Sequence, residues 1–345
     1  MSEAWIIDGV RSPRGRGKPG VGSLSEIHPQ RVMAQVLNGL KDKVGFDPAD
    51  VEDFVAGNGS GTGDHAHDIA RMSVLDAGWP ITTPGVTLHR FCGSGQQAVT
   101  VAAQSIMAGH QDLVIGGGVE SMSRYAPNHT DGFTANNTHL FEQYPLIPQG
   151  ISADLIATIE GFSREDVDGY AVRSQERTQA SIEAGYFKTG LVPIYHADGR
   201  LALDRDEHPR PGTTMETMVG LNPSFEKMGK TLYDGQVRTF DDICKSVYPK
   251  INAVNHVHHA GNSSGVVDGA SAILLASPKY AKAHGLKPRA RIVMTATAGT
   301  EPVIMLTAPG PAAGPPRSLG LGRLGRPLAS ATPDPRTRQG PRRPP

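Results

Sequence analysis

Short apolar runs alternate with helical segments over the first 120 residues of this chain. Four runs have the length and composition of buried strands, at residues 5–8, 53–57, 85–91 and 112–116. Residues 30–43 repeat apolar side chains along one helical face, and residues 66–78 and 93–109 are predicted helices that end at glycine. Strands alternating with helices predict βαβ units, and therefore an α/β fold with a mainly parallel sheet covered by helices on both faces.

This rhythm stops between residues 121 and 252, which are more polar and rich in turns around a predicted helix at 164–184. Strand character returns at residues 271–277 and 291–296. We therefore expect residues 1–120 and 253–288 to form one α/β domain and residues 121–252 to form an inserted loop domain. Long excursions of this kind commonly shape substrate sites.

The last segment, residues 308–345, has a different composition. It holds ten of the 27 prolines and no aromatic residue, so burial cannot offset its ordering entropy, and disorder is predicted. The abrupt change after residue 307 is typical of a message read in another frame, and we interpret the chain as truncated or frameshifted there.

Charge and composition argue against a nucleic-acid-binding, disulfide-stabilised or membrane protein. The 34 basic and 34 acidic residues balance, and residues 1–307 carry a net charge of about −6 because the tail holds seven Arg and one Asp. No basic field favours nucleic acid. Two cysteines argue against a disulfide framework, and no apolar run has the length of a signal peptide or membrane span. The sequence predicts a cytoplasmic protein that binds neither nucleic acid nor membrane.

The most informative cysteine is Cys92, where a predicted strand meets a predicted helix. Gly93, Ser94 and Gly95 allow a tight turn, and the helix amino terminus would favour the thiolate, which is the reactive form. Its backbone N–H could also donate to an oxyanion. The alternative is a small buried side chain, the common fate of a free cysteine. Cys244 lies in a charged helical segment without glycine, and we expect it to be inert.

Four segments, taken together, resemble the thiolase family. CGSGQQA at residues 92–98 resembles its acylation motif CxSGxxA, and GGGVESMS at 116–123 resembles the glycine-rich loop near that cysteine. AGNSSGVVDGASA at 260–272 is similar to the signature GNxSGxxDGA, and the opening IIDGVRSPRGRGKPG is similar to the first strand and loop. The segments follow the family order over residues 1 to about 307.

The resemblance implies an acyl-CoA acyltransferase of five-layered, thiolase-like fold. Cys92 would be the nucleophile acylated by a 3-oxoacyl-CoA or acetyl-CoA. Ala260 and Ser264 match positions that contact pantetheine, and Arg210 matches a basic position near the CoA nucleotide. CoA is then a substrate, no further cofactor is implied, and the family implies a homodimer or homotetramer.

The resemblance also implies residues that this chain does not show. The family's second half supplies an Asn in NEAF, a His in GHP and a second Cys in CxG, and none of these motifs occurs in residues 1–345. Residues 289–307 resemble the start of that half. We therefore expect impaired turnover, and an exposed, aggregation-prone apolar helix at 93–109.

Two clusters resemble metal sites, but neither is predicted to be one. DHAHD at 64–68 stands at a loop-to-helix junction, where Asp68 is suited to cap the helix, and HVHH at 256–259 has no carboxylate or cysteine ligand nearby in sequence. Two functional alternatives stay open: a ketoacyl-synthase-type condensing enzyme, and a non-catalytic CoA- or lipid-binding protein.

Overall fold

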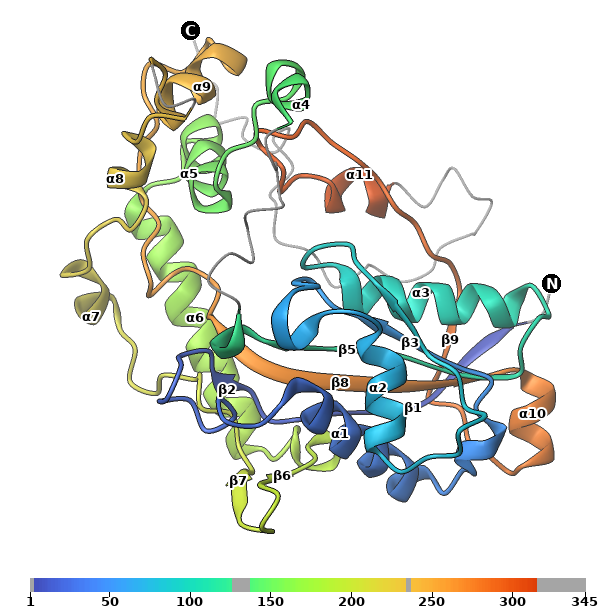
Figure 1. The fold of residues 1–345 in the computed structure, drawn as a ribbon. Coiled ribbons are helices and arrows are strands. Elements are labelled where there is room, and N and C mark those ends of the chain that lie inside the picture. Colours follow the sequence, from blue (N-terminus) through green and yellow to red (C-terminus); the bar gives the residue numbers. More distant parts are fainter. Residues whose placement is uncertain (1–2, 126–136, 234–236, 315–345) are drawn as a thin grey trace, which may run out of the picture.

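The computed structural model describes residues 3–125, 137–233 and 237–314, and it is built around one seven-stranded sheet (Figure 1). Its strands run in the order β4-β3-β5-β8-β1-β9, with β2 paired to β8. Their bounds are β1 Ala4–Arg11, β2 Gly15–Arg16, β3 Asp53–Gly57, β4 Val86–Leu88, β5 Leu113–Ser121, β8 Val267–Ala276 and β9 Ala290–Ile292.

The prediction of a mainly parallel sheet is wrong. Only the β3–β4 and β3–β5 pairs are parallel, whereas β8 runs antiparallel to both β5 and β1, and β9 runs antiparallel to β1. Helical crossovers do return β1, β3, β4 and β5 in one direction. After the long excursion, however, β8 enters between β1 and β5 from the opposite end, which makes the sheet mixed.

Helices cover both faces of the sheet, as predicted. α1 (Pro29–Val44) and α2 (Ile69–Asp76) lie on one face and α3 (Ser94–Met107) on the other (Figure 1). Buried side chains form a large core between the sheet and the first two helices, and a smaller core under α3. α10 (Pro278–Ala283) follows β8 at the sheet's end.

Local signals place the helix ends close to their predicted positions. α1 begins at Pro29, which has no N–H to leave unpaired, and stops at Gly45 in the left-handed conformation with φ 81°. Asp68 accepts a hydrogen bond from the Arg71 N–H and so caps α2, as the sequence indicated.

Residues between β5 and β8 form mostly short helices around a third core. These elements are α4 (Thr138–Gln143), α5 (Gln149–Glu160), α6 (Arg164–Glu183), β6 (Ile194–Tyr195), β7 (Leu201–Leu203), α7 (Met215–Val219), α8 (Glu226–Gly229) and α9 (Phe240–Val247). Single 3₁₀ turns occur at Pro48–Asp50, Gly63–His65, Met122–Arg124 and Lys188–Gly190. The core joins α5, α9 and Val303, so the segment after β9 packs on this excursion.

Two further expectations can be compared with the structure, one for the last segment and one for α3. Within the segment expected to be disordered, Pro309–Ala313 forms a short helix, α11, and residues 315–345 lie outside the described residues. The predicted exposure of α3 is wrong, because its apolar side chains are buried or half-buried and its most exposed residues, Gln96 and Gln104, are polar. No helix in the described ranges is long and apolar enough to cross a membrane.

Candidate active site

The chain turns sharply at Cys92, between the end of β4 and the start of α3. Phe91 has φ 47°, an unfavourable left-handed conformation for a bulky residue, and it redirects the chain just before the cysteine. Ser94 secures this turn because its hydroxyl accepts the Arg90 N–H at 2.8 Å and donates to the Phe91 carbonyl at 2.6 Å. Cys92 is exposed just before α3, at the strand-to-helix junction that its sequence context indicated.

Cys92 lines a cavity of about 570 Å³. Its walls combine residues from all four segments that resemble the family motifs, among them Arg14, Glu120 and Ala270. Gly59, Phe91 and Tyr125, which lie outside those segments, also line it. Segments separated by more than 250 residues in sequence thus meet around one thiol.

Buried hydrogen bonds join these segments. Asp268, which is fully buried, accepts from the Ser123 N–H at 2.9 Å and from its hydroxyl at 2.5 Å. The Ser12 N–H donates to the Ala270 carbonyl at 2.8 Å, and the Ser12 hydroxyl accepts the Ala270 N–H at 3.0 Å. The glycine-rich strand, the opening loop and the GNxSGxxDGA-like segment are therefore held in one fixed arrangement.

Glycines allow the close approach that the cavity requires. A Cβ at Gly57 would lie 2.2 Å from the Ser94 carbonyl carbon, and one at Gly116 would lie 2.7 Å from the Val99 Cα. Only glycine fits at these two points, where α3 rests directly on β3 and β5.

Glu120 is a site residue that the sequence analysis missed. Its carboxylate accepts the Gly59 N–H at 2.6 Å, and a Cβ at Gly59 would lie 3.4 Å from the Phe91 carbonyl oxygen. Burial raises the pKa of Glu120, and burial together with Glu120 raises that of Tyr125. The acidic residue within GGGVESMS was the only signal that could have indicated it.

The proposed CoA positions lie away from this cavity's lining. Ala260 and Ser264 are exposed on the loop before β8. Exposed Arg210 lies on a neighbouring segment and donates its backbone N–H to Gln175. The segment of Arg210 packs against the loop of Ala260 and Ser264 through His208. The contact is close, because a Cβ added at Gly265 would lie 2.1 Å from the His208 ring. Burial and then the charge of Arg210 lower the pKa of His208.

The other conspicuous cysteine and histidines have structural partners. Cys244 is buried, and burial together with Asp241 raises its pKa to about 12. His65 is buried and accepts the Ser121 N–H, and burial lowers its pKa to about 4. Among the described residues, no group of His, Cys, Asp or Glu is arranged to hold a metal ion.

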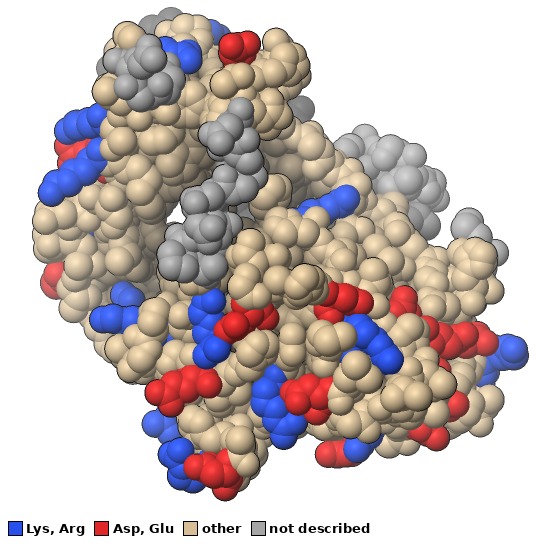
Figure 2. Space-filling model, in the orientation of Figure 1, with Lys and Arg blue, Asp and Glu red and all other residues tan. Residues whose placement is uncertain are grey.

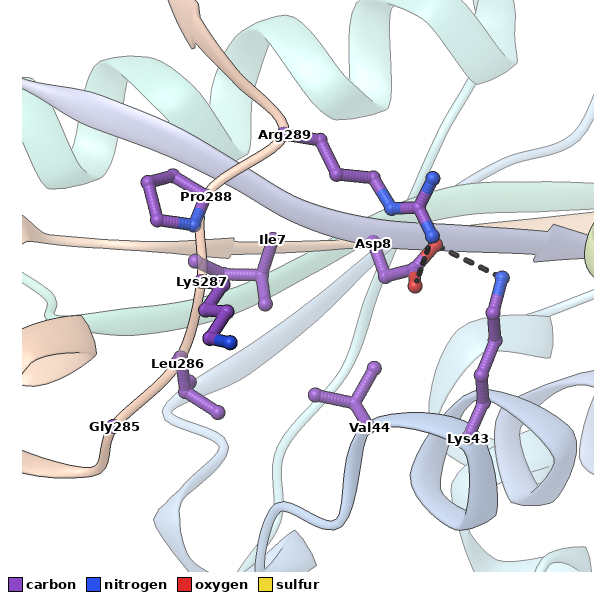
Figure 3. A pocket seen from close by; sticks show the side chains of 9 residues that line it. All are labelled: Ile7, Asp8, Lys43, Val44, Gly285, Leu286, Lys287, Pro288 and Arg289. Atoms are coloured by element: carbon purple, nitrogen blue, oxygen red, sulfur yellow. Dashed lines mark hydrogen bonds and ion pairs between the residues drawn. The ribbon is translucent and has the colours of Figure 1, made fainter.

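A second cavity of about 360 Å³ shares no residue with the first (Figure 3). Asp8 of β1 lies there between Lys43 and Arg289, accepting hydrogen bonds at 3.0 Å from each. These ion pairs tie β1 to the end of α1 and to the segment before β9. Elsewhere, basic and acidic side chains are interspersed over the face shown in Figure 2.

Comparisons with known proteins agree with this geometry. The family described as "Thiolase, N-terminal domain" matches residues 4–237. The Steroid 3-ketoacyl-CoA thiolase FadA6 of Mycobacterium tuberculosis is 37% identical over 323 residues, covering 90% of this chain and 71% of that protein. The Beta-ketoadipyl-CoA thiolase of Pseudomonas aeruginosa is 36% identical over 329 residues, covering 90% and 75%.

Solved structures give the same result. The crystal structure of the Bacillus anthracis acetyl-CoA acetyltransferase superimposes with a TM-score of 0.72 at 31% identity, covering 91% of this chain and 75% of that chain. The predicted thiolase-like α/β fold is confirmed by this match. The chain belongs to the thiolase family of CoA-dependent acyltransferases.

Proposed function

We propose that this thiolase transfers acyl groups through a thioester on Cys92. The thiolate attacks the C3 carbonyl of a 3-oxoacyl-CoA, the C2–C3 bond breaks, and C2 takes a proton to leave as acetyl-CoA. The thiol of free CoA then attacks the acyl-cysteine, which restores the thiolate and releases the shortened acyl-CoA. The observation that carries this proposal is an exposed Cys92, at the start of a helix, in a cavity shared by all the motif segments.

CoA is proposed to lie along the exposed loop before β8. Small side chains at Ala260 and Ser264 leave room for a narrow pantetheine arm, and Arg210 offers a positive charge to the phosphates of the nucleotide. The contact between His208 and Gly265 supports this arrangement, because it places the segment of Arg210 beside the loop.

Turnover by residues 1–345 alone is proposed to be slow. The motifs NEAF, GHP and CxG do not occur in them, and each missing acid or base group lowers a rate by about 10²–10⁴-fold. Acylation of Cys92 should then be detectable while steady-state cleavage of a 3-oxoacyl-CoA stays weak. A cleavage rate equal to that of a full-length relative would refute the proposal that turnover is slow. It would not contradict the proposed role of Cys92.

The central experiment is acylation by acetyl-CoA, followed by intact mass and peptide mapping. Wild-type protein should gain one acetyl group on Cys92, Cys92→Ala should gain none, and Cys244→Ala should react like the wild type. CoA binding without acylation would favour a non-catalytic CoA-binding protein. Acetylation at Cys244 would contradict the assignment.

We also propose the division into an α/β domain at 1–120 and 253–288, a loop domain at 121–252 and the beginning of a second domain at 289–307. The separate core around α5 and α9 supports a distinct loop domain. Two unpaired cysteines fit the cytoplasm. Light scattering of the purified chain would test the homodimer or homotetramer that the family implies.

A further inference from the structure

The HVHH segment, residues 256–259, leads directly into the proposed CoA loop, and its three imidazoles all bind carboxylates. These carboxylates belong to helices of the excursion: Asp154 on α5, Asp168 on α6 and Asp241 on α9. Figure 1 shows this group of helices on one side of the sheet, where the chain returns toward β8. The histidines thus join the loop to three separate helices.

Asp154 is the centre of this network. It is fully buried and accepts four hydrogen bonds. Its Oδ2 faces His256 Nδ1 at 2.7 Å, while its Oδ1 accepts His258 Nδ1 at 2.7 Å and the N–H groups of Val257 and His258 at 3.0 Å each. One carboxylate therefore fixes the backbone of two consecutive residues.

The two nitrogens of His256 both face carboxylates. Nδ1 lies 2.7 Å from Asp154, and Nε2 lies 3.2 Å from Oδ2 of Asp241. A neutral imidazole has one N–H, so its second nitrogen would direct a lone pair at a carboxylate. Only the imidazolium satisfies both contacts, and the side chain, 7% exposed, carries this charge in a largely buried position.

His259 holds the loop itself in a different way. Its Nδ1 accepts the Gly261 N–H at 3.0 Å, so the proton is on Nε2, which donates to Asp168 at 2.8 Å. Asn262 donates to the same Asp168 oxygen and accepts the His259 N–H. The chain on both sides of Ala260 is thereby fixed.

We propose that Asp154 and His256 are positioning residues for CoA. The imidazolium held between Asp154 and Asp241 orients the carboxylate that fixes the backbone of residues 257 and 258. Together with the bonds of His259 and Asn262 to Asp168, this sets Ala260 and Ser264 where a pantetheine arm can pass. This inference rests on the proposed function, because it assumes that CoA occupies this loop. Loss of the His256 proton leaves one carboxylate without its donor and loosens the loop.

The groups that face His256 define how its protonation affects binding. They are Asp154 from α5, Asp241 from α9, Glu226 from α8, and His258 from its own segment, which shares Asp154 with His256. Three carboxylates therefore surround one imidazolium, and this charge balance maintains the proton. CoA affinity should decrease as the pH rises far enough to remove it.

The first test measures the wild-type chain directly. Long-range ¹H–¹⁵N spectra of the histidine side chains, assigned with His256→Gln, should show both nitrogens of His256 protonated at neutral pH. A His256 ring with one unprotonated nitrogen would overturn the proposal. This readout does not depend on CoA, and the variant serves only to assign the His256 signals of the wild-type chain.

The second test is calorimetric binding of free CoA. His256→Gln should weaken binding by about tenfold and remove its dependence on pH, Asp241→Asn should give a smaller loss, and the exposed control His110→Gln should bind like the wild type. Wild-type affinity in His256→Gln would refute the inference alone. Absence of CoA binding by the wild type would instead refute the proposed function on which it rests.

Discussion

At the scale of single residues, the site depends on how one turn is held. Cys92 and Cys244 are the same residue type, yet one is exposed at a turn and the other is buried beside Asp241. Ser94 helps to hold the turn that exposes Cys92, because its hydroxyl accepts the Arg90 N–H and donates to the Phe91 carbonyl. A strained φ at Phe91 needs such support to persist.

Ser94→Ala should therefore weaken both the fold and the reaction. Removing the two hydrogen bonds of the buried Ser94 side chain should lower the free energy of unfolding by about 1–2 kcal/mol and slow the acylation of Cys92. Urea unfolding and the rate of acetyl transfer to Cys92 measure the two effects. Ser181→Ala, whose hydroxyl bonds the Arg177 carbonyl on α6, is the matched control and should change neither. An unaltered acylation rate in Ser94→Ala would show that the turn does not need this hydroxyl.

At the scale of elements, the sequence predicted what local patterns determine. β3 has the predicted bounds, and α1, α3 and α6 begin and end within a residue or two of theirs, because apolar periodicity, caps and glycines act over a few residues. β5 and β8 extend beyond their predictions because glycines and small residues continue each strand. The direction of β8 was not predictable, since it depends on where a long excursion returns.

The close contact between α3 and β5 gives an element-scale prediction. Gly116→Ala would place a methyl group 2.7 Å from the Val99 backbone, which cannot move without moving α3. We expect a loss of about 1–3 kcal/mol in unfolding free energy, as for other overpacked interiors. Gly169, inside α6, has open space around it, so Gly169→Ala should instead stabilise by about 0.5–1 kcal/mol. Equal urea midpoints for the two variants would contradict the packing described here.

The histidine–carboxylate network predicts a pH optimum for the packing of α5 and α9. Burial disfavours the imidazolium, but hydrogen bonds to Asp154 and Asp241 outweigh it and raise the pKa of His256 above its ordinary 6.5. Burial likewise opposes the charge of Asp154, and the bonds from His256 and His258 outweigh it and lower that pKa below 3.8. The His256 contribution is complete below pH 6.5 and is lost as the pH rises through the raised pKa. The Asp154 contribution is present above 3.8 and is lost as the pH falls through the lowered pKa.

Urea unfolding across this range should consequently show declining stability on the alkaline side that His256→Gln removes. The variant should be less stable than the wild type at neutral pH and approach it as the pH rises. Parallel stability curves for the two proteins would indicate that His256 does not titrate between folded and unfolded states.

At the scale of the whole molecule, the site depends on contacts that no short pattern contains. The junction at Cys92 could be predicted from its own neighbours in sequence, whereas Glu120 acquires its hydrogen bond only through the tertiary approach of Gly59. The carboxylates that bind HVHH lie 15 to about 100 residues away, which is why the sequence showed none beside it. Exposure of α3 was expected because the motifs of the family's second half, which would cover this helix, do not occur in the sequence. In the structure the apolar side chains of α3 are buried or half-buried against the sheet.

One ion pair joins the sheet to the excursion and can be tested directly. Asp206, 4% exposed, accepts both guanidinium nitrogens of Arg11 at 2.7 and 2.8 Å and the Arg14 N–H at 2.8 Å. Burial opposes its charge, but the bonds from Arg11 and Arg14 outweigh it and lower the pKa of Asp206 to about 2.

Asp206→Asn leaves Arg11 without its charged partner beside the cavity, so the unfolding free energy should fall by about 1–3 kcal/mol. Protease cleavage between β7 and α7 should also accelerate, because the segment of Asp206 and Arg210 loses its attachment to β1. Asp198→Asn breaks only an exposed pair with Arg200 and should match the wild type in both measurements. If both variants unfold and cleave alike, the excursion is held to the sheet by packing alone.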